Sequence, residues 1–115
     1  MAAAIACGAC AVIVGTRLVA TPESRASAAY KQALIDTDPE GIICTDKVTG
    51  NPANWIASSV ADMEERPPLT SKKLRDFWSA GQSVAQVRDI KPAAEIVAEI
   101  VNEYCETCRQ LSGTI

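Results

Sequence analysis

The residues best suited to chemistry are the adjacent Gly15 and Thr16, which follow a short apolar run. That run, Ala11 to Val14, is typical of a buried parallel strand covered on both faces, so we expect a strand there. Glycine lets a ligand approach the backbone, and threonine adds a hydroxyl beside its own N–H. The strand end therefore suits a phosphate group, although the same pair also follows strands that bind nothing.

Cysteines form the second candidate set, since four of the five fall into the C-x-x-C pairs Cys7/Cys10 and Cys105/Cys108. Zinc sites usually hold two such pairs about 15–20 residues apart, whereas here almost the whole chain separates them. The odd count also argues against a full disulfide framework. We expect no metal site, and a cysteine-based metal or redox module remains as an alternative function.

The sequence contains no histidine, and no carboxylate adjoins Gly15 and Thr16. A general base is therefore missing beside the candidate phosphate site, and we assign no catalytic residue. The formal net charge is −3 with no basic block, which argues against a nucleic-acid partner. The apolar N-terminal stretch is shorter than the roughly 20 residues that span a bilayer and lacks a basic leader. We expect a cytoplasmic protein without membrane contact.

The stretch from Gly8 to Ser24 resembles the last barrel strand of the nitronate monooxygenase family, formerly called 2-nitropropane dioxygenases. Relatives of that family include FMN-dependent enoyl-ACP reductases. The family pattern is roughly G-A-D-x-V-Q-V-G-T-R-F-x-x-x-x-E-S, and this chain has Cys10 for Asp, Ile13 for Gln and Leu18 for Phe. Later segments match in order and spacing, so the resemblance covers nearly the whole chain: Tyr30–Leu34, Thr49–Pro52 with Trp55, Ala80–Gln82 and Asp89–Pro92.

The resemblance implies an α/β fold, namely a C-terminal fragment of an FMN-binding (β/α)8 TIM barrel with its last strand, followed by a mostly helical C-terminal extension. A complete barrel takes about 250 residues, and this chain has 115, so we expect most of the barrel to be absent. The residues that carry over as FMN contacts are Ile13, Val14, Gly15 and Thr16, the last two at the phosphate. Gly81 and Gln82 are expected near the active site, or else in an ordinary connection between helices.

The activity implied by the resemblance is a flavin-dependent oxidation of alkyl nitronates with O2, or the reduction of an enoyl thioester, with a small-molecule substrate. Nitronate monooxygenases use a barrel histidine as their base, which this sequence lacks. We therefore expect the isolated chain to be inactive and to hold FMN poorly. The alternative is a non-catalytic segment that associates with a second copy or with a missing barrel portion.

Three parts position these residues: 1–20 as the end of the barrel, 21–91 as a helical insertion or lid, and 92–115 as a packing helix. We expect helices over 1–7, 22–36, 53–65, 70–78 and from 92 onward, with a short strand over 42–44. Gly8 should end the first helix, and Thr21-Pro22-Glu23 should begin the second. The last helix carries an apolar stripe that packs on a core or, if exposed, forms an association patch: Ile96, Val97, Ile100, Val101, Tyr104, Cys105, Cys108 and Leu111.

Overall fold

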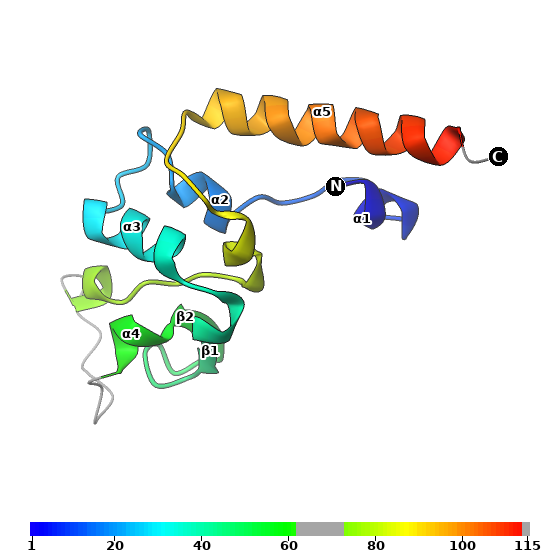
Figure 1. The fold of residues 1–115 in the computed structure, drawn as a ribbon. Coiled ribbons are helices and arrows are strands. Elements are labelled where there is room, and N and C mark those ends of the chain that lie inside the picture. The colour runs from blue at the N-terminus through cyan, green and yellow to red at the C-terminus, as the bar shows by residue number, and fades with distance from the viewer. Residues whose placement is uncertain (62–72, 114–115) are drawn as a thin grey trace.

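The chain forms a body of short elements from which one long helix projects (Figure 1). The computed structural model describes residues 1–61 and 73–113. In chain order the elements are α1 (Ala2–Ala6), α2 (Thr16–Val19), α3 (Ala28–Asp36), the 3-10 turn η1 (Pro39–Gly41), β1 (Ile42–Thr45), β2 (Ala53–Ile56), α4 (Ala57–Val60), the 3-10 turns η2 (Lys73–Asp76) and η3 (Gln82–Gln86), and α5 (Ala93–Ser112).

A β-hairpin forms the centre of the body. Strands β1 and β2 pair antiparallel, with Ile42 opposite Ile56. The segment 78–80 runs along the other edge of β2, because the Ile56 N–H donates to the Trp78 carbonyl at 2.8 Å. The Ala80 N–H likewise donates to the Asn54 carbonyl at 3.3 Å. The hairpin thus fixes the backbone immediately before Gly81.

Helix α3 packs on this hairpin through one buried face. The Ser27 hydroxyl caps the helix by accepting the Tyr30 N–H at 3.1 Å, a common way to satisfy a free first-turn donor. The Tyr30 ring stacks on Trp78 with ring centres 5.6 Å apart, and its hydroxyl donates to the Ser79 carbonyl. The main core is a single cluster of buried side chains: Ala20, Leu34, Ile42, Ile56, Ala80, Val84 and Val87.

The N-terminal arm ends its first helix as the sequence predicts. Gly8 has a φ of +94°, its N–H donates to the Ile5 carbonyl at 2.9 Å, and the Ala9 N–H donates to the Ala4 carbonyl at 3.0 Å. These two bonds form a Schellman motif, in which a left-handed glycine closes the helix. The prediction of a helix over residues 1–7 with Gly8 as its stop is confirmed.

The strand expected from Ala11 to Val14 is absent, which corrects the sequence-based prediction. These residues have no regular structure, and the Ile13 side chain is 100% exposed. A parallel strand is stabilised by neighbouring strands and by layers on both faces, and within the described chain residues 11–14 have neither. Helix α2 begins directly at Thr16 instead.

Two predicted helices also differ from the structure. The helix expected from Pro22 begins only at Ala28, because the Thr21 hydroxyl accepts the Ser24 N–H and closes a local turn first. The helix expected over 53–65 is replaced by β2 and the single turn α4, because residues 53–56 pair with β1. Its later part, and the start of the helix expected over 70–78, lie outside the described residues. The short strand predicted at 42–44 is confirmed within β1.

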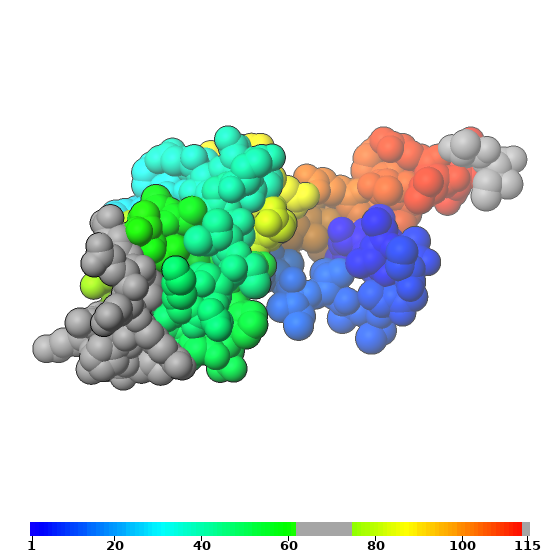
Figure 2. Space-filling model, turned by 90° about the horizontal axis from the view of Figure 1, so that it is seen from below, coloured from blue at the N-terminus to red at the C-terminus, as the bar shows by residue number. Residues whose placement is uncertain are grey.

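Helix α5 and the N-terminal arm lie beside each other at one side of the body (Figures 1 and 2). The radius of gyration is 16.8 Å, against about 13 Å for a compact chain of this size. Of the predicted apolar stripe of α5, Ile96 is buried, whereas Val97 is 53% and Leu111 61% exposed. The stripe is therefore mostly an open surface and only at its first turn a core face.

Candidate functional site

A hydrogen bond joins the two segments that the sequence analysis singled out. The Thr16 hydroxyl oxygen accepts the Gly81 N–H at 3.0 Å, although 65 positions separate them in the chain. Thr16 begins α2 and Gly81 precedes η3, and these two elements pack against each other. The structure thus brings Gly15 and Thr16 next to Gly81.

The hairpin explains why Gly81 lies at this point. Pairing along β2 carries the chain from Trp78 to Ala80, whose side chain is buried in the main core. Gly81 then turns the chain into η3, whose Val84 is fully buried. The position of Gly81 therefore follows from apolar packing on both sides of it, at Ala80 and at Val84.

A cavity of about 710 Å³ opens beside this junction, between the N-terminal arm, η3 and α5. Three of the predicted cofactor contacts, Ile13, Val14 and Gly15, line it. Thr16, Gly81 and Gln82 do not, and the Gln82 side chain is exposed. The arrangement therefore separates Gln82 from the cavity.

Further cavity residues come from segments that the sequence analysis did not assign to the site. Ser83 and Gln86 contribute from η3, Arg17 from α2, and Glu99 and Glu103 from α5. Ser83 lies in the small-residue stretch already noted, and Arg17 lies in the matched Gly-Thr-Arg motif, so both carried a signal. The α5 residues carried none, because an acidic side of an amphipathic helix is usually only a solvated face.

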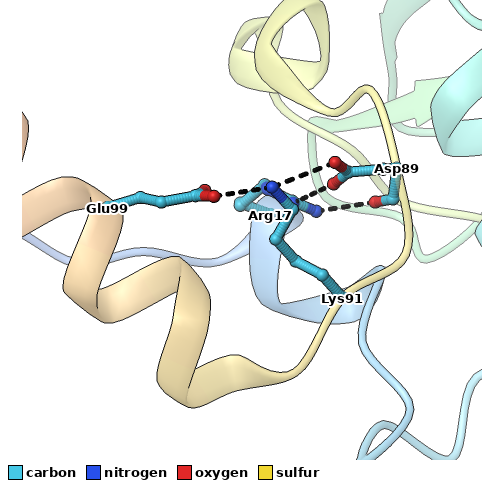
Figure 3. A network of polar contacts seen from close by, with 4 residues as sticks. All are labelled: Arg17, Asp89, Lys91 and Glu99. Carbon is cyan, nitrogen blue, oxygen red and sulfur yellow. Dashed lines mark hydrogen bonds and ion pairs between the residues drawn. The ribbon is translucent and has the colours of Figure 1, made fainter.

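The charges at the cavity are unevenly distributed. Arg17 pairs with Asp89 at 2.5 Å, and Lys91 pairs with both Asp89, at 3.0 Å, and Glu99, at 2.7 Å (Figure 3). A hydrogen bond from Lys91, together with the charges of Lys91 and Arg17, lowers the pKa of the Asp89 carboxyl. Because Glu99 and Glu103 face the cavity from α5, that wall disfavours an anion. Gly15, which lines the cavity, and Thr16, which adjoins it outside the lining, carry no charge and form the better place for an anion.

Besides the ion pair between Lys91 and Glu99, a hydrogen bond to Glu23 fixes the start of α5 near this site. The Ala93 N–H donates to the Glu23 carboxylate at 3.0 Å, which supplies the cap that Pro92 cannot provide through a side chain. Hydrogen bonds from its own backbone N–H and from the Ala93 N–H lower the pKa of the Glu23 carboxyl. Glu23 is therefore held in its ionised form.

The cysteine pairs do not assemble into one site. All five cysteines are free thiols, and within the described residues no group of three or more His, Cys, Asp or Glu side chains is placed to hold a metal ion. A hydrogen bond with Cys108 raises the pKa of the Tyr104 hydroxyl on the same helix.

None of the helices in the described parts of the chain combines the length and apolar character needed to cross a membrane.

Comparison with known proteins identifies the family to which the chain belongs. The family model described as nitronate monooxygenase matches residues 1–77, which is well over half of the chain. The chain belongs to the nitronate monooxygenase family.

Individual relatives agree with this assignment. A nitronate monooxygenase from Paraburkholderia phytofirmans is 31% identical over a 134-residue alignment that covers 96% of this chain and 36% of the relative. FabK from Thermotoga maritima has a similar structure, with a TM-score of 0.78 and 30% identity over 100% of this chain and 43% of FabK. A mutant of the same FabK gives a TM-score of 0.76 at 29% identity, over 100% of this chain and 41% of that one. The chain thus spans about two fifths or less of the length of these relatives.

Proposed function

We propose that this chain is the FMN-phosphate-binding, C-terminal part of a flavin-dependent oxidoreductase of the nitronate monooxygenase type. In such an enzyme the segment 11–14 would be the last strand of a (β/α)8 barrel, and the substrate would be an alkyl nitronate oxidised with O2. The observation that carries the proposal is the Thr16–Gly81 hydrogen bond. It joins the two segments at which the family resemblance places the cofactor.

Two features beside the Thr16–Gly81 hydrogen bond suit a phosphate group. Because the Thr16 oxygen accepts the Gly81 N–H, its own O–H points elsewhere and is available to donate to a phosphate oxygen. No atom lies within 4 Å of the position that a Cβ would take on Gly15, so a ligand oxygen has room to reach that backbone. FMN itself would supply the redox chemistry when bound. The residues of this chain would bind its phosphate and orient its tail.

Catalysis by this chain alone is not part of the proposal. The sequence contains no histidine to act as the base, and the acidic cavity residues Glu99 and Glu103 lie on a wall that disfavours the substrate anion. A nitronate is itself an anion, so substrate binding would need residues from the rest of a barrel. We therefore expect the isolated chain to be inactive.

Flavin content tests this proposal. The 115-residue chain should purify colourless and should acquire flavin absorbance only when a complementary N-terminal barrel portion is added. The variant T16V should reduce that flavin uptake, whereas T49V, on the β1–β2 turn, should leave it unchanged. A colourless complex with the barrel portion would refute FMN binding. Stoichiometric flavin in the chain alone would refute the claim that it is incomplete.

The second candidate function is association through α5, and the large exposed surface of the chain favours it. The chain exposes 7875 Å², against about 6100 Å² for a compact monomer of its mass. Val97 and Val101 contribute to this surface, as does Ile13 on the arm. The partner we propose is a barrel portion of the same family, with a second copy of the chain as the other candidate. V97E with V101E should abolish association in sedimentation experiments, while E95Q on the same helix should not.

A further inference from the structure

Arg17 connects the candidate phosphate site to the chain that follows η3. Its side chain is only 14% exposed. One guanidinium nitrogen donates to the Asp89 carbonyl at 2.9 Å and the other to the Asp89 carboxylate at 2.5 Å. Two bonds from one planar guanidinium to one residue fix direction as well as distance. The residue directly after Thr16 is thereby held in a single orientation.

Asp89 is in turn held by a second cation. Its other carboxylate oxygen lies 3.0 Å from Lys91, which also contacts Glu99 on α5 at 2.7 Å. Figure 3 shows the four side chains as one continuous ion-pair chain from α2 to α5. Arg17 thus binds a carboxylate that is itself anchored to the longest helix of the molecule.

The start of helix α2 is the end that Arg17 anchors. The helix has only four residues, and residues 11–14 before it have no regular structure. Val19 and Ala20 fix its other end on the main core, and Thr16 has its bond to Gly81. The Arg17 bonds add a fixed point directly beside Thr16, since they attach the next residue to Asp89, eight positions after Gly81.

We propose that Arg17 is a positioning residue for FMN, which acts through Asp89 to hold Gly15 and Thr16 in the geometry that receives the phosphate. The inference rests on the proposed function, and it assigns Arg17 no contact with the cofactor. If Arg17 bound the phosphate directly, freeing it from Asp89 would strengthen binding. If Arg17 positions Thr16, losing Asp89 weakens binding as much as losing Arg17.

The test is an NMR titration of the ¹⁵N-labelled 115-residue chain. The probes are FMN, ribitol 5-phosphate, which has the phosphate-bearing tail of FMN, and ribitol, which lacks the phosphate. Both phosphate compounds should shift the backbone amides of Gly15, Thr16 and Gly81, and ribitol should not. R17Q and D89N should each raise the apparent Kd for both phosphate compounds about tenfold, the loss expected for hydrogen bonds to charged groups.

Matched variants separate the possible results. R109Q removes an arginine that pairs with Glu106 on the exposed end of α5, so it changes the net charge equally and should bind like the parent chain. R17K keeps the charge but not the two-pronged geometry and should fall between the parent and R17Q. Core amides such as those of Leu34 and Val84 report whether each variant is folded, and D89N serves if R17Q is not.

Four outcomes would overturn the inference. Unchanged Kd values in folded R17Q would refute positioning while leaving the proposed function intact. Equal losses in R17Q and R109Q would reduce the effect to net charge, and tighter binding by D89N would indicate direct contact between Arg17 and phosphate. If the phosphate compounds shift no amide at Gly15 or Thr16 even after a complementary N-terminal barrel portion is added, the proposed function fails together with the inference.

Discussion

At the scale of single residues, the site depends on the hydroxyl oxygen of Thr16. It satisfies the Gly81 N–H at 3.0 Å in a partly buried setting, and it leaves its own proton for a ligand. Valine has nearly the same shape as threonine but no acceptor, so a substitution there isolates the role of the oxygen. The Gly81 N–H would be left without its partner.

We expect T16V to lower the free energy of unfolding by about 1 kcal/mol, as for a lost hydrogen bond that is not fully buried. T16S keeps the oxygen and should stay close to the parent chain. Urea denaturation of the three proteins measures the difference. Equal losses in T16V and T16S would indicate that the methyl group, rather than the hydroxyl, makes the stabilising contact.

The sequence predicted some residues of the site better than others, for physical reasons. Gly15 and Thr16 were selected because a small residue and a hydroxyl at a strand end suit phosphate chemistry; the structure joins Thr16 to Gly81, and their role at a phosphate stays a prediction. The contact between Asp89 and Arg17 was not, since nothing in a single sequence shows that residues 72 positions apart meet. Gln82 was chosen for its donors and acceptor, yet its side chain is exposed and lies off the cavity.

At the scale of elements, the start of α3 shows that capping residues compete for partners. Ser27 begins α3 by accepting the Tyr30 N–H at 3.1 Å, whereas the sequence analysis placed the helix start at Thr21-Pro22-Glu23. Both segments carry good capping residues, but Thr21 closes its own turn with Ser24 and Glu23 is engaged with α5. Competing partners from distant segments therefore decided where the helix begins.

Replacing the cap tests this assignment. S27A should lower the free energy of unfolding by about 1 kcal/mol, because a first-turn N–H of α3 loses its acceptor. S27D, which keeps an acceptor, should retain most of the stability. Thermal unfolding followed by circular dichroism provides the comparison. An S27A variant as stable as the parent would mean that solvent satisfies this N–H equally well.

Two segments, 11–14 and 53–56, were assigned to the wrong kind of element because strands depend on partners. Residues 53–56 read as the start of a helix, yet they pair with β1 on one edge and with segment 78–80 on the other. Residues 11–14 read as a strand, yet the described chain offers them no partner. The apolar pattern was the same kind of signal in both cases, and neighbours at long range decided the outcome.

The ion pairs that join α2 to α5 predict a pH dependence of stability. A hydrogen bond from Lys91 is the main cause of the lowered pKa of Asp89. A carboxyl with a lowered folded-state pKa stabilises the protein above its unfolded-state pKa of about 4 and loses that effect as pH falls through the folded-state value. The stability difference between the parent chain and D89N should therefore be constant near neutral pH, begin to fall near pH 4 and vanish only below the lowered folded-state pKa.

Urea denaturation across a pH series measures this difference. D46N, which removes an exposed carboxylate from the turn after β1, serves as the control and should show no such loss in acid. Lys91 affects stability at the alkaline end of the pH range, and a hydrogen bond with Glu99 raises its pKa. The stability that Lys91 contributes is complete below its unfolded-state pKa and should disappear only as pH rises through the raised folded-state pKa. A parent-minus-D89N difference that persists at low pH would contradict the assignment of Asp89.

At the scale of the whole molecule, the described chain is open on the side where α5 and the N-terminal arm lie. The body has its own core around Leu34 and Ile56, whereas α5 and the arm lie to one side of it (Figure 2) and share few contacts with it. Both expose apolar side chains. Family membership and the share of the relatives that the chain covers agree with this shape. The proposal of a phosphate site completed by further barrel elements thus accounts for both the site and the open surface.

The open side of α5 also has a calorimetric consequence. With 7875 Å² exposed in the folded state, the chain buries about 15% less surface on folding than a compact protein of its mass. The heat capacity of unfolding should fall below the usual 12–15 cal/mol/K per residue, so the stability curve should be flat and the denaturant m-value small. Scanning calorimetry at several pH values measures this, and an ordinary heat capacity would contradict it. Binding of a partner on α5 should then carry a negative heat-capacity change of its own.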